Sequence, residues 1–136
     1  MSASEPDVSE VARVADFRAA LRKFLRKSER IARASGLTPQ RHLLLLMIKG
    51  APDGRETSTV TELAERLQLA QSTVTELVRR AEEAGLIERE ASTTDGRVAH
   101  LRLSAEGERR LMRSFTELET ERRELREAFA HLDDSL

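Results

Sequence analysis

Apolar residues recur three and four positions apart along residues 8–35. This alternating spacing places side chains on one face of a helix and leaves its other faces polar. The pattern therefore predicts a long amphipathic helix. Its apolar face consists of Val14, Phe17, Leu21, Phe24, Ser28 and Ile31, of which only the serine is polar.

A similar pattern occupies residues 104–136, which begin with a serine suited to a helix N-cap. The row is heptad-like, but Arg122 interrupts it, so the pattern leaves open whether the region is one helix or two. The row consists of Leu111, Phe115, Leu118, Arg122, Leu125, Phe129 and Leu132.

The two end segments share an excess of apolar surface. Each carries more of it than one small domain needs to bury, and packing against a second copy of the chain would cover the excess. We therefore expect residues 8–35 and 104–136 to be the dimerisation helices of a homodimer.

A short central helix is predicted after the first end segment. Thr38 suits its N-cap, and Pro39 suits the first helical position, where a missing N–H costs nothing. The run over residues 43–48 is apolar nearly all round, so this helix should be buried. Gly50 should end it.

The middle of the chain has the order helix, tight turn, helix, strand, turn, strand. Thr59 and Glu62 have the spacing of a capping box for the first of these helices, and the second begins at Gln71. Gly85 is typical of a helix stop. The strand-like runs are residues 86–90 and 98–103, with Asp95 and Gly96 between them as a hairpin signal.

These elements predict a single domain over residues 1–136 that is mainly α with a small β-hairpin. Two short helices followed by a β-ribbon are typical of a module that reads duplex DNA. Residues 37–103 are therefore expected to form the DNA-binding region, between N- and C-terminal dimerisation helices.

Composition narrows the class of protein. Apolar residues make up 39% and charged residues 35% of the 136 residues, a mixture typical of a mostly helical soluble domain. The absence of cysteine excludes disulfides, thiol catalysis and cysteine metal sites. The polar start of the chain is unlike a secretory signal, and no apolar run is long enough to span a bilayer. We expect a cytoplasmic protein without a membrane partner.

No catalytic or cofactor site is predicted. The three histidines, His42, His100 and His131, lack the spacing of metal ligands, and no nucleophile has a recognisable setting. We therefore expect neither an enzyme nor a metal or cofactor site.

The charge distribution does not favour nucleic acid in general. Residues 8–35 have eight basic and three acidic residues (+5), and residues 104–136 have six and nine (−3). Residues 59–103 have six basic and eight acidic residues (−2), within a net charge of −1 for the chain. Attraction to phosphate must therefore depend on where a few arginines lie.

An arginine stripe runs along the first predicted helix at four-residue spacing and consists of Arg18, Arg22, Arg26 and Arg30. Like charges at this spacing repel one another. We expect acidic residues of the same chain or of a partner chain to face the stripe, such as Glu117, Glu121 and Glu124.

The helix that begins at Gln71 carries the candidate DNA-reading residues. Short hydroxyl and amide side chains near a helix N-terminus approach phosphates and base edges closely, and arginines further along bind guanine or phosphate. The alternative is an ordinary solvated polar face. The candidates are Gln71, Ser72, Thr73, Thr75, Glu76, Arg79 and Arg80.

The predicted hairpin adds a second candidate contact. Arg97 at its tip could enter a narrow minor groove, and Asp95 could hold the guanidinium in a bidentate pair. The alternative is a surface ion pair of little energy.

Together these motifs resemble the winged helix-turn-helix of the MarR family of bacterial transcription regulators. The matching segments are Leu-Ala-Glu-Arg-Leu at 63–67, Ser-Thr-Val-Thr at 72–75, Gly-Leu-Ile-Glu-Arg at 85–89, Asp-Gly-Arg at 95–97, Leu-Ser-Ala-Glu-Gly at 103–107 and Leu-Thr-Pro-Gln at 37–40. The resemblance implies a homodimer that binds pseudo-palindromic operators, usually as a repressor released by a small ligand. It places Ser72, Thr73, Thr75 and Arg79 in the major groove, and Arg97, oriented by Asp95, in the minor groove.

Glu76 departs from the family pattern, which commonly has a basic residue there. A carboxylate repels phosphate but accepts a hydrogen bond from cytosine N4, so it could alter sequence preference or weaken binding. The alternative function is a winged-helix protein-interaction module with little DNA affinity.

A small-molecule pocket is expected between the end helices and the reading module. Phe17, Leu21 and His42 are its candidate lining residues, and a small aromatic compound is the candidate ligand. The competing interpretation of His42 is a core histidine with satisfied hydrogen bonds.

Overall fold

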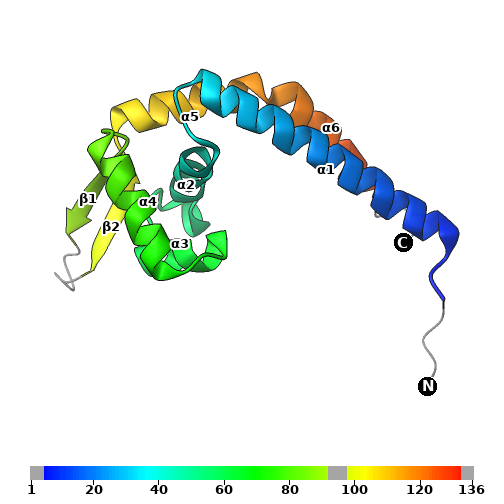
Figure 1. Cartoon of the computed structure of the whole chain (residues 1–136), viewed down its shortest axis with the longest axis horizontal. Coiled ribbons are helices and arrows are strands. Elements are labelled where there is room, and N and C mark those ends of the chain that lie inside the picture. Colours follow the sequence, from blue (N-terminus) through cyan, green and yellow to red (C-terminus); the bar gives the residue numbers. More distant parts are fainter. Residues whose placement is uncertain (1–4, 92–97, 133–136) are drawn as a thin grey trace.

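The computed structural model describes residues 5–91 and 98–132. Within these ranges the chain has six α-helices and one antiparallel pair of strands, which confirms the predicted fold class. The molecule consists of a rounded head and a long arm (Figure 1). The elements are α1 (Val8–Ala34), α2 (Pro39–Lys49), the 3-10 helix η1 (Pro52–Gly54), α3 (Val60–Leu67), α4 (Gln71–Glu83), β1 (Ile87–Ala91), β2 (Ala99–Leu103), α5 (Ala105–Glu117) and α6 (Glu119–Leu132).

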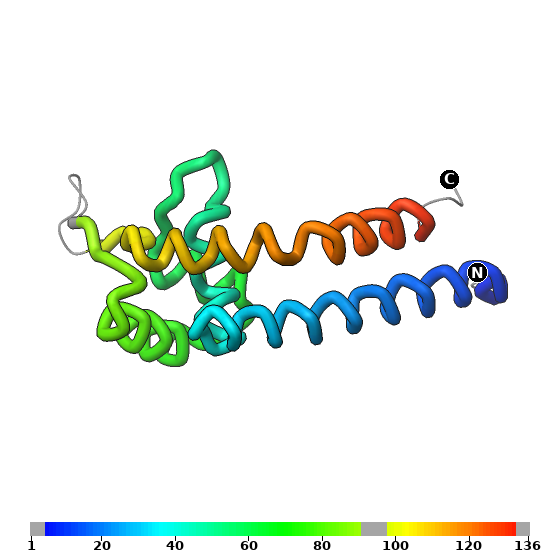
Figure 2. Tube along the Cα trace, turned by 90° about the horizontal axis from the view of Figure 1, so that it is seen from above, coloured from blue at the N-terminus to red at the C-terminus, as the bar shows by residue number. Residues whose placement is uncertain are grey.

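The arm consists of α1 and α6, which lie side by side (Figure 2). Phe17 of α1 meets Phe129 of α6 edge to face, with ring centroids 6.0 Å apart. The start of α1 and the end of α6 lie together at the far end of the arm (Figures 1 and 2). The two predicted end segments therefore pack on each other within one chain.

Much of the arm's apolar surface remains uncovered in a single chain. In α1 only Ile31 and Ala32 are buried, and in α6 no residue is. Phe129 keeps 60% of its surface exposed despite its contact with Phe17. The arm therefore has the apolar excess that its sequence predicts.

The head is built around α2. Leu44, Leu45 and Ile48 of this helix are fully buried, whereas Leu43 is 41% exposed, so the burial predicted from the apolar run holds for one face of the helix. They join side chains from α3, α4, β2 and α5 in one core that includes Leu63, Val74, Val78, Leu101 and Leu111. None of the helices that the structure describes is long and apolar enough to cross a membrane.

The predicted helix caps are present. The Thr38 hydroxyl accepts from the Arg41 amide at 3.1 Å, which starts α2. Thr59 and Glu62 form both hydrogen bonds of the capping box at the start of α3. Gly85 ends α4 with a positive φ of 76°, a conformation that favours glycine.

The C-terminal region is two helices, a point that the sequence leaves open. They meet at Leu118, whose amide donates to the carbonyl oxygens of Ser114 (3.2 Å) and Phe115 (3.3 Å). The Arg122 guanidinium lies 3.6 Å from the Phe115 ring centroid and also donates to the Phe115 carbonyl oxygen. The arginine that interrupts the apolar row thus binds at the break between α5 and α6.

The hairpin is joined to the head by its second strand. Ile87 pairs with Leu103 and Ala91 with Ala99, in antiparallel register. Ser58 forms an additional bridge to Leu101: the Ser58 nitrogen lies 3.0 Å from the Leu101 carbonyl oxygen, and the Leu101 nitrogen lies 2.8 Å from the Ser58 carbonyl oxygen. The predicted turn residues Asp95 and Gly96 lie outside the described residues.

The start of α5 is pressed closely against the chain before β1. The Ser104 amide donates to the Leu86 carbonyl oxygen at 2.9 Å, and its hydroxyl donates to the Gly85 carbonyl oxygen at 2.6 Å. Gly107 is buried one turn later, where an added Cβ would overlap the Leu86 carbonyl oxygen. The position therefore requires glycine because of space.

Gly107→Ala should destabilise the protein, although the same change in an open helical position usually stabilises. We expect a loss of about 1–3 kcal/mol, the usual cost of overpacking a core. Urea unfolding followed by circular dichroism measures it. A midpoint equal to or above that of the wild type would contradict the steric explanation.

Candidate nucleic-acid interface

Helix α4 lies between α3 and the β-hairpin on the head (Figure 1). Its buried face consists of Val74, Val78 and Ala81, which belong to the core. This packing fixes which face of α4 points outward. Helix, turn and strand thus hold one surface of α4 in a defined orientation.

The outward face of α4 brings together the predicted reading residues. Six of the seven are exposed, and Glu76 is partly buried by its neighbours. The helix begins after Ala70, whose methyl side chain cannot accept hydrogen bonds from the first amides. Those N–H groups carry the positive end of the helix dipole. The exposed residues are Gln71, Ser72, Thr73, Thr75, Arg79 and Arg80.

Both arginines of this face are engaged by one carboxylate, that of Glu76. Arg79 donates to its two oxygens at 3.0 and 2.5 Å, and Arg80 Nε donates to Oε1 at 3.0 Å. Glu83 holds Arg79 from the next turn at 2.5 Å. The guanidinium groups that could contact DNA are therefore paired within the helix.

The pKa of Glu76 reports this pairing. Hydrogen bonds from Arg79, and then from Arg80, lower the pKa of the carboxyl from 4.5 to about 2. Because a lowered pKa favours the ionised form, the carboxylate keeps its charge as pH falls through the range where an ordinary glutamate is protonated. The groups are solvent-exposed, so the ion pairs stabilise the fold little.

The stem of the hairpin carries two further paired arginines. Arg89 of β1 reaches back to Glu82 of α4 at 2.8 Å, and Arg102 of β2 pairs across the strands with Glu90 at 2.6 Å. The predicted minor-groove residue Arg97 and its partner Asp95 lie outside the described residues. Their proposed roles stay predictions from the sequence.

A separate apolar cavity of about 250 Å³ lies among α1, α2 and the junction of α5 with α6. His42 lines it, and burial lowers the pKa of this histidine. Phe17 and Leu21 line other depressions further along the arm, so the three predicted ligand residues do not meet at one place. The cavity walls include Phe24, Leu25, Leu43, Leu46, Phe115, Leu118 and Arg122.

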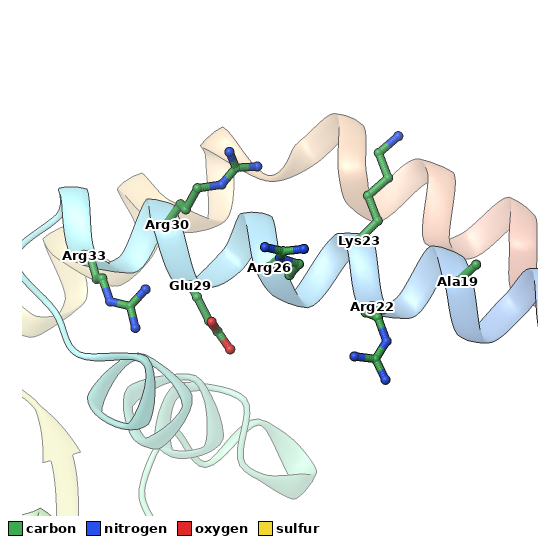
Figure 3. Close-up of a pocket in the computed structure, with 7 residues that line it drawn as sticks. All are labelled: Ala19, Arg22, Lys23, Arg26, Glu29, Arg30 and Arg33. Carbon is green, nitrogen blue, oxygen red and sulfur yellow. The ribbon is translucent and has the colours of Figure 1, made fainter.

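The arginine stripe takes no part in the ion pairs that join α1 to α6 within the described part of the chain. Arg22 extends to one side of the helix and Arg30 to the other (Figure 3). Among the described residues no carboxylate forms an ion pair with the stripe, so the predicted pairing within the chain is wrong. Glu121 and Glu124 instead pair with two lysines of α1, Lys27 (3.0 Å) and Lys23 (3.7 Å), and Glu117 pairs with Arg113 (3.4 Å).

The reason for this correction is the rotation of α1. Its apolar face turns Phe17 and Phe24 toward α6, and the two lysines flank that face. At 100° per residue, the four arginines of the stripe spread over about 120° of the helix surface that Phe17 and Phe24 do not occupy. A pairing of the stripe with a second chain stays a prediction.

Two groups of residues were missed in the sequence. Glu83 was not among the candidates, although its four-residue spacing from Arg79 is a clear signal. The cavity residues of α5 and α6 were assigned only to the dimerisation surface. Nothing in the spacing distinguishes the two uses, because both need apolar side chains at helical intervals.

Comparisons with known proteins agree with this geometry. Residues 35–98 match the MarR family model, and no curated protein matches the chain. A mutant MarR from E. coli, solved in complex with operator DNA, is 18% identical with a TM-score of 0.63. That match covers 88% of this chain and 78% of MarR.

Two other solved structures have the same fold. A mutant MepR from S. aureus, bound to an oligodeoxyribonucleotide, is 23% identical with a TM-score of 0.64, and the match covers 88% of this chain and 80% of MepR. AbsC, a MarR family transcriptional regulator from Streptomyces coelicolor, is 18% identical with a TM-score of 0.66, covering 96% and 84%. The winged helix-turn-helix resemblance read from the sequence is confirmed.

Proposed function

Because residues 35–98 match the MarR family model and the described part of the chain has the fold of solved MarR-family regulators, we propose that this protein is a sequence-specific DNA-binding transcription regulator. The observation that carries the proposal is the outward face of α4, which presents short polar side chains at an uncapped helix N-terminus beside a hairpin. Such a face fits the major groove, and the hairpin fits the flank.

In this proposal α4 contacts the bases, and the β-hairpin, which is the wing of the fold, fixes the position of the protein on the DNA. Ser72, Thr73 and Thr75 are short enough to let the helix axis approach the groove floor, and Gln71 offers an amide to adenine. Arg79 gives a bidentate contact to guanine, and Arg97 enters the adjacent minor groove. Acting on a bacterial chromosome, the protein would work in the cytoplasm.

Selection of bound sequences from a random duplex pool tests the function. A reader enriches one pseudo-palindromic sequence, whose half-sites lie about ten base pairs apart. Enrichment of no sequence, together with no duplex binding at low salt, would refute the proposal and favour the protein-interaction module.

Arg97→Ala should then weaken binding to the selected sequence by about 10-fold to 100-fold, with the fold retained. Shift assays at a fixed salt concentration measure the change. The matched control is Arg102→Ala, which removes an arginine of the same hairpin that pairs with Glu90. Equal binding by the Arg97→Ala variant and the wild type would exclude the wing contact.

The arms are proposed to hold two copies together as a homodimer. Their uncovered apolar residues, including Phe129 and Val14, are the surface that a second arm would bury. Dimerisation also places two α4 helices on one operator, as the symmetry of such sites requires.

Phe129→Glu should convert the dimer to a monomer, because a carboxylate would be buried in the arm contact. Light scattering after size-exclusion chromatography gives the mass, and circular dichroism checks that the helices persist. Leu69→Glu, a change to an exposed leucine of the head, should leave the dimer intact. A monomeric wild type would overturn the proposed assembly.

The regulator is proposed to be a repressor that a small aromatic acid releases from DNA. The cavity beside His42 is mostly apolar, and Arg122 at its wall could pair with a carboxylate. Phe17 and Leu21, the other two candidates, would act at the arm and not in this cavity.

Benzoate derivatives should raise the melting temperature of the wild type as their concentration rises, with the logarithm of the concentration once it exceeds Kd. Leu46→Trp, which fills the cavity, should remove that rise while keeping the fold. If no derivative stabilises the wild type, or if the tryptophan variant responds equally, the cavity is not the ligand site.

A further inference from the structure

We propose that Glu76 is a competing carboxylate that keeps Arg79 and Arg80 from binding DNA phosphates and so limits binding to sequences other than the operator. The inference rests on the proposed DNA-binding function and adds a specificity-determining role to one residue of α4. It follows from contacts within a single helix, where all three side chains are described.

The geometry of α4 lets one carboxylate serve both arginines. Arg79 and Arg80 follow Glu76 by three and four residues, the two spacings that bring side chains together on a helix. The three hydrogen bonds to Glu76 measure 2.5 to 3.0 Å. Glu83 adds a second acceptor for Arg79 only.

The pairing changes how the helix meets a polyanion. DNA attracts a protein by exchanging condensed counterions for protein cations, and a cation already paired with a carboxylate contributes less to that exchange. An arginine that leaves Glu76 for a phosphate also leaves the carboxylate close to that phosphate, and like charges repel. For these arginines, replacing the pair with Glu76 by a phosphate contact therefore gains little free energy.

A matched base offers more than a phosphate. Guanine accepts two hydrogen bonds from one guanidinium, and cytosine on the opposite strand offers a donor to the freed carboxylate. Exposed ion pairs are weak, so such a contact can displace them. The hydrogen bonds from Arg79 and Arg80 lower the pKa of Glu76 further below the physiological range, so the carboxylate is charged wherever the protein meets DNA.

The test replaces the carboxylate by an amide of the same shape. Glu76→Gln should strengthen binding to a random duplex by about tenfold and steepen the dependence of log Kd on log salt by about 0.9, the slope for one added phosphate contact, because Arg80 is freed while Glu83 still holds Arg79. Binding to the selected operator should change less, so the ratio of specific to random affinity should fall.

The matched control is Glu82→Gln, which makes the same charge change on the same helix but frees Arg89 of β1. It should alter the salt slope little. Adding Arg79→Gln and Arg80→Gln to Glu76→Gln should cancel the gain. Thermal melting of each variant confirms that the fold is kept.

The outcomes separate this inference from the proposed function. If the wild type selects an operator but both glutamate variants gain equally, or Glu76→Gln gains nothing, the competing role is wrong. A larger loss on the operator than on random DNA would make Glu76 a base-reading residue only, which also overturns it. If the wild type selects no sequence, the regulator function fails, and the role of Glu76 in operator specificity fails with it; a gain in random binding by Glu76→Gln would then support only its competition with phosphates for the arginines. If no variant binds, both fail.

Discussion

Burial of α2 is the constraint on which the other surfaces depend. This helix contacts α1, α3, α4, α5 and β2, and its leucines leave no surface exposed at Leu44 and Leu45. Full burial of two such side chains contributes on the order of 3–6 kcal/mol before entropy is counted. Because α4 and α3 of the head and α1 of the arm all pack on α2, the reading face and the arm keep one relative orientation.

The same helix explains why the head and the cavity are connected. His42 occupies the side of α2 that faces α1, while Ile48 lies in the core about 1.7 turns later at 3.6 residues per turn. A change in the position of α2 would therefore reach the cavity and the core together. In the proposed function, a chain with a net charge of −1 binds DNA through the position of the α4 side chains and not through its overall charge.

Local signals in the sequence predicted most of the fold. Thr38, Thr59 and Gly85 act within one helical turn, and the structure has them at the caps and stop that their residue types indicate. The break at Leu118 was not predictable, because it depends on Arg122 folding back over Phe115. The predicted partners of the arginine stripe were wrong for a related reason, because pairing between α1 and α6 depends on how each helix is rotated about its axis.

The candidate site divides in the same way. Periodicity predicted the outward face of α4. The pairing of Arg79 with Glu76 and Glu83 was not predicted, although spacings of three and four residues within one helix indicate it. Phe17 and His42 were grouped as apolar neighbours of a pocket, whereas the length of α1 carries Phe17 along the arm and away from His42. Asp95 and Arg97 lie outside the described residues, so the wing stays a sequence prediction.

The junction between α5 and α6 has a consequence for the shape of the whole molecule. Phe115, Leu118 and Arg122 form the elbow of the C-terminal segment, and the same three side chains are walls of the cavity. The α5–α6 junction thus forms one wall of the cavity, opposite residues of α1 and α2. A molecule bound in the cavity would press on this junction, and a small change of angle there would displace the far end of α6 by a larger distance.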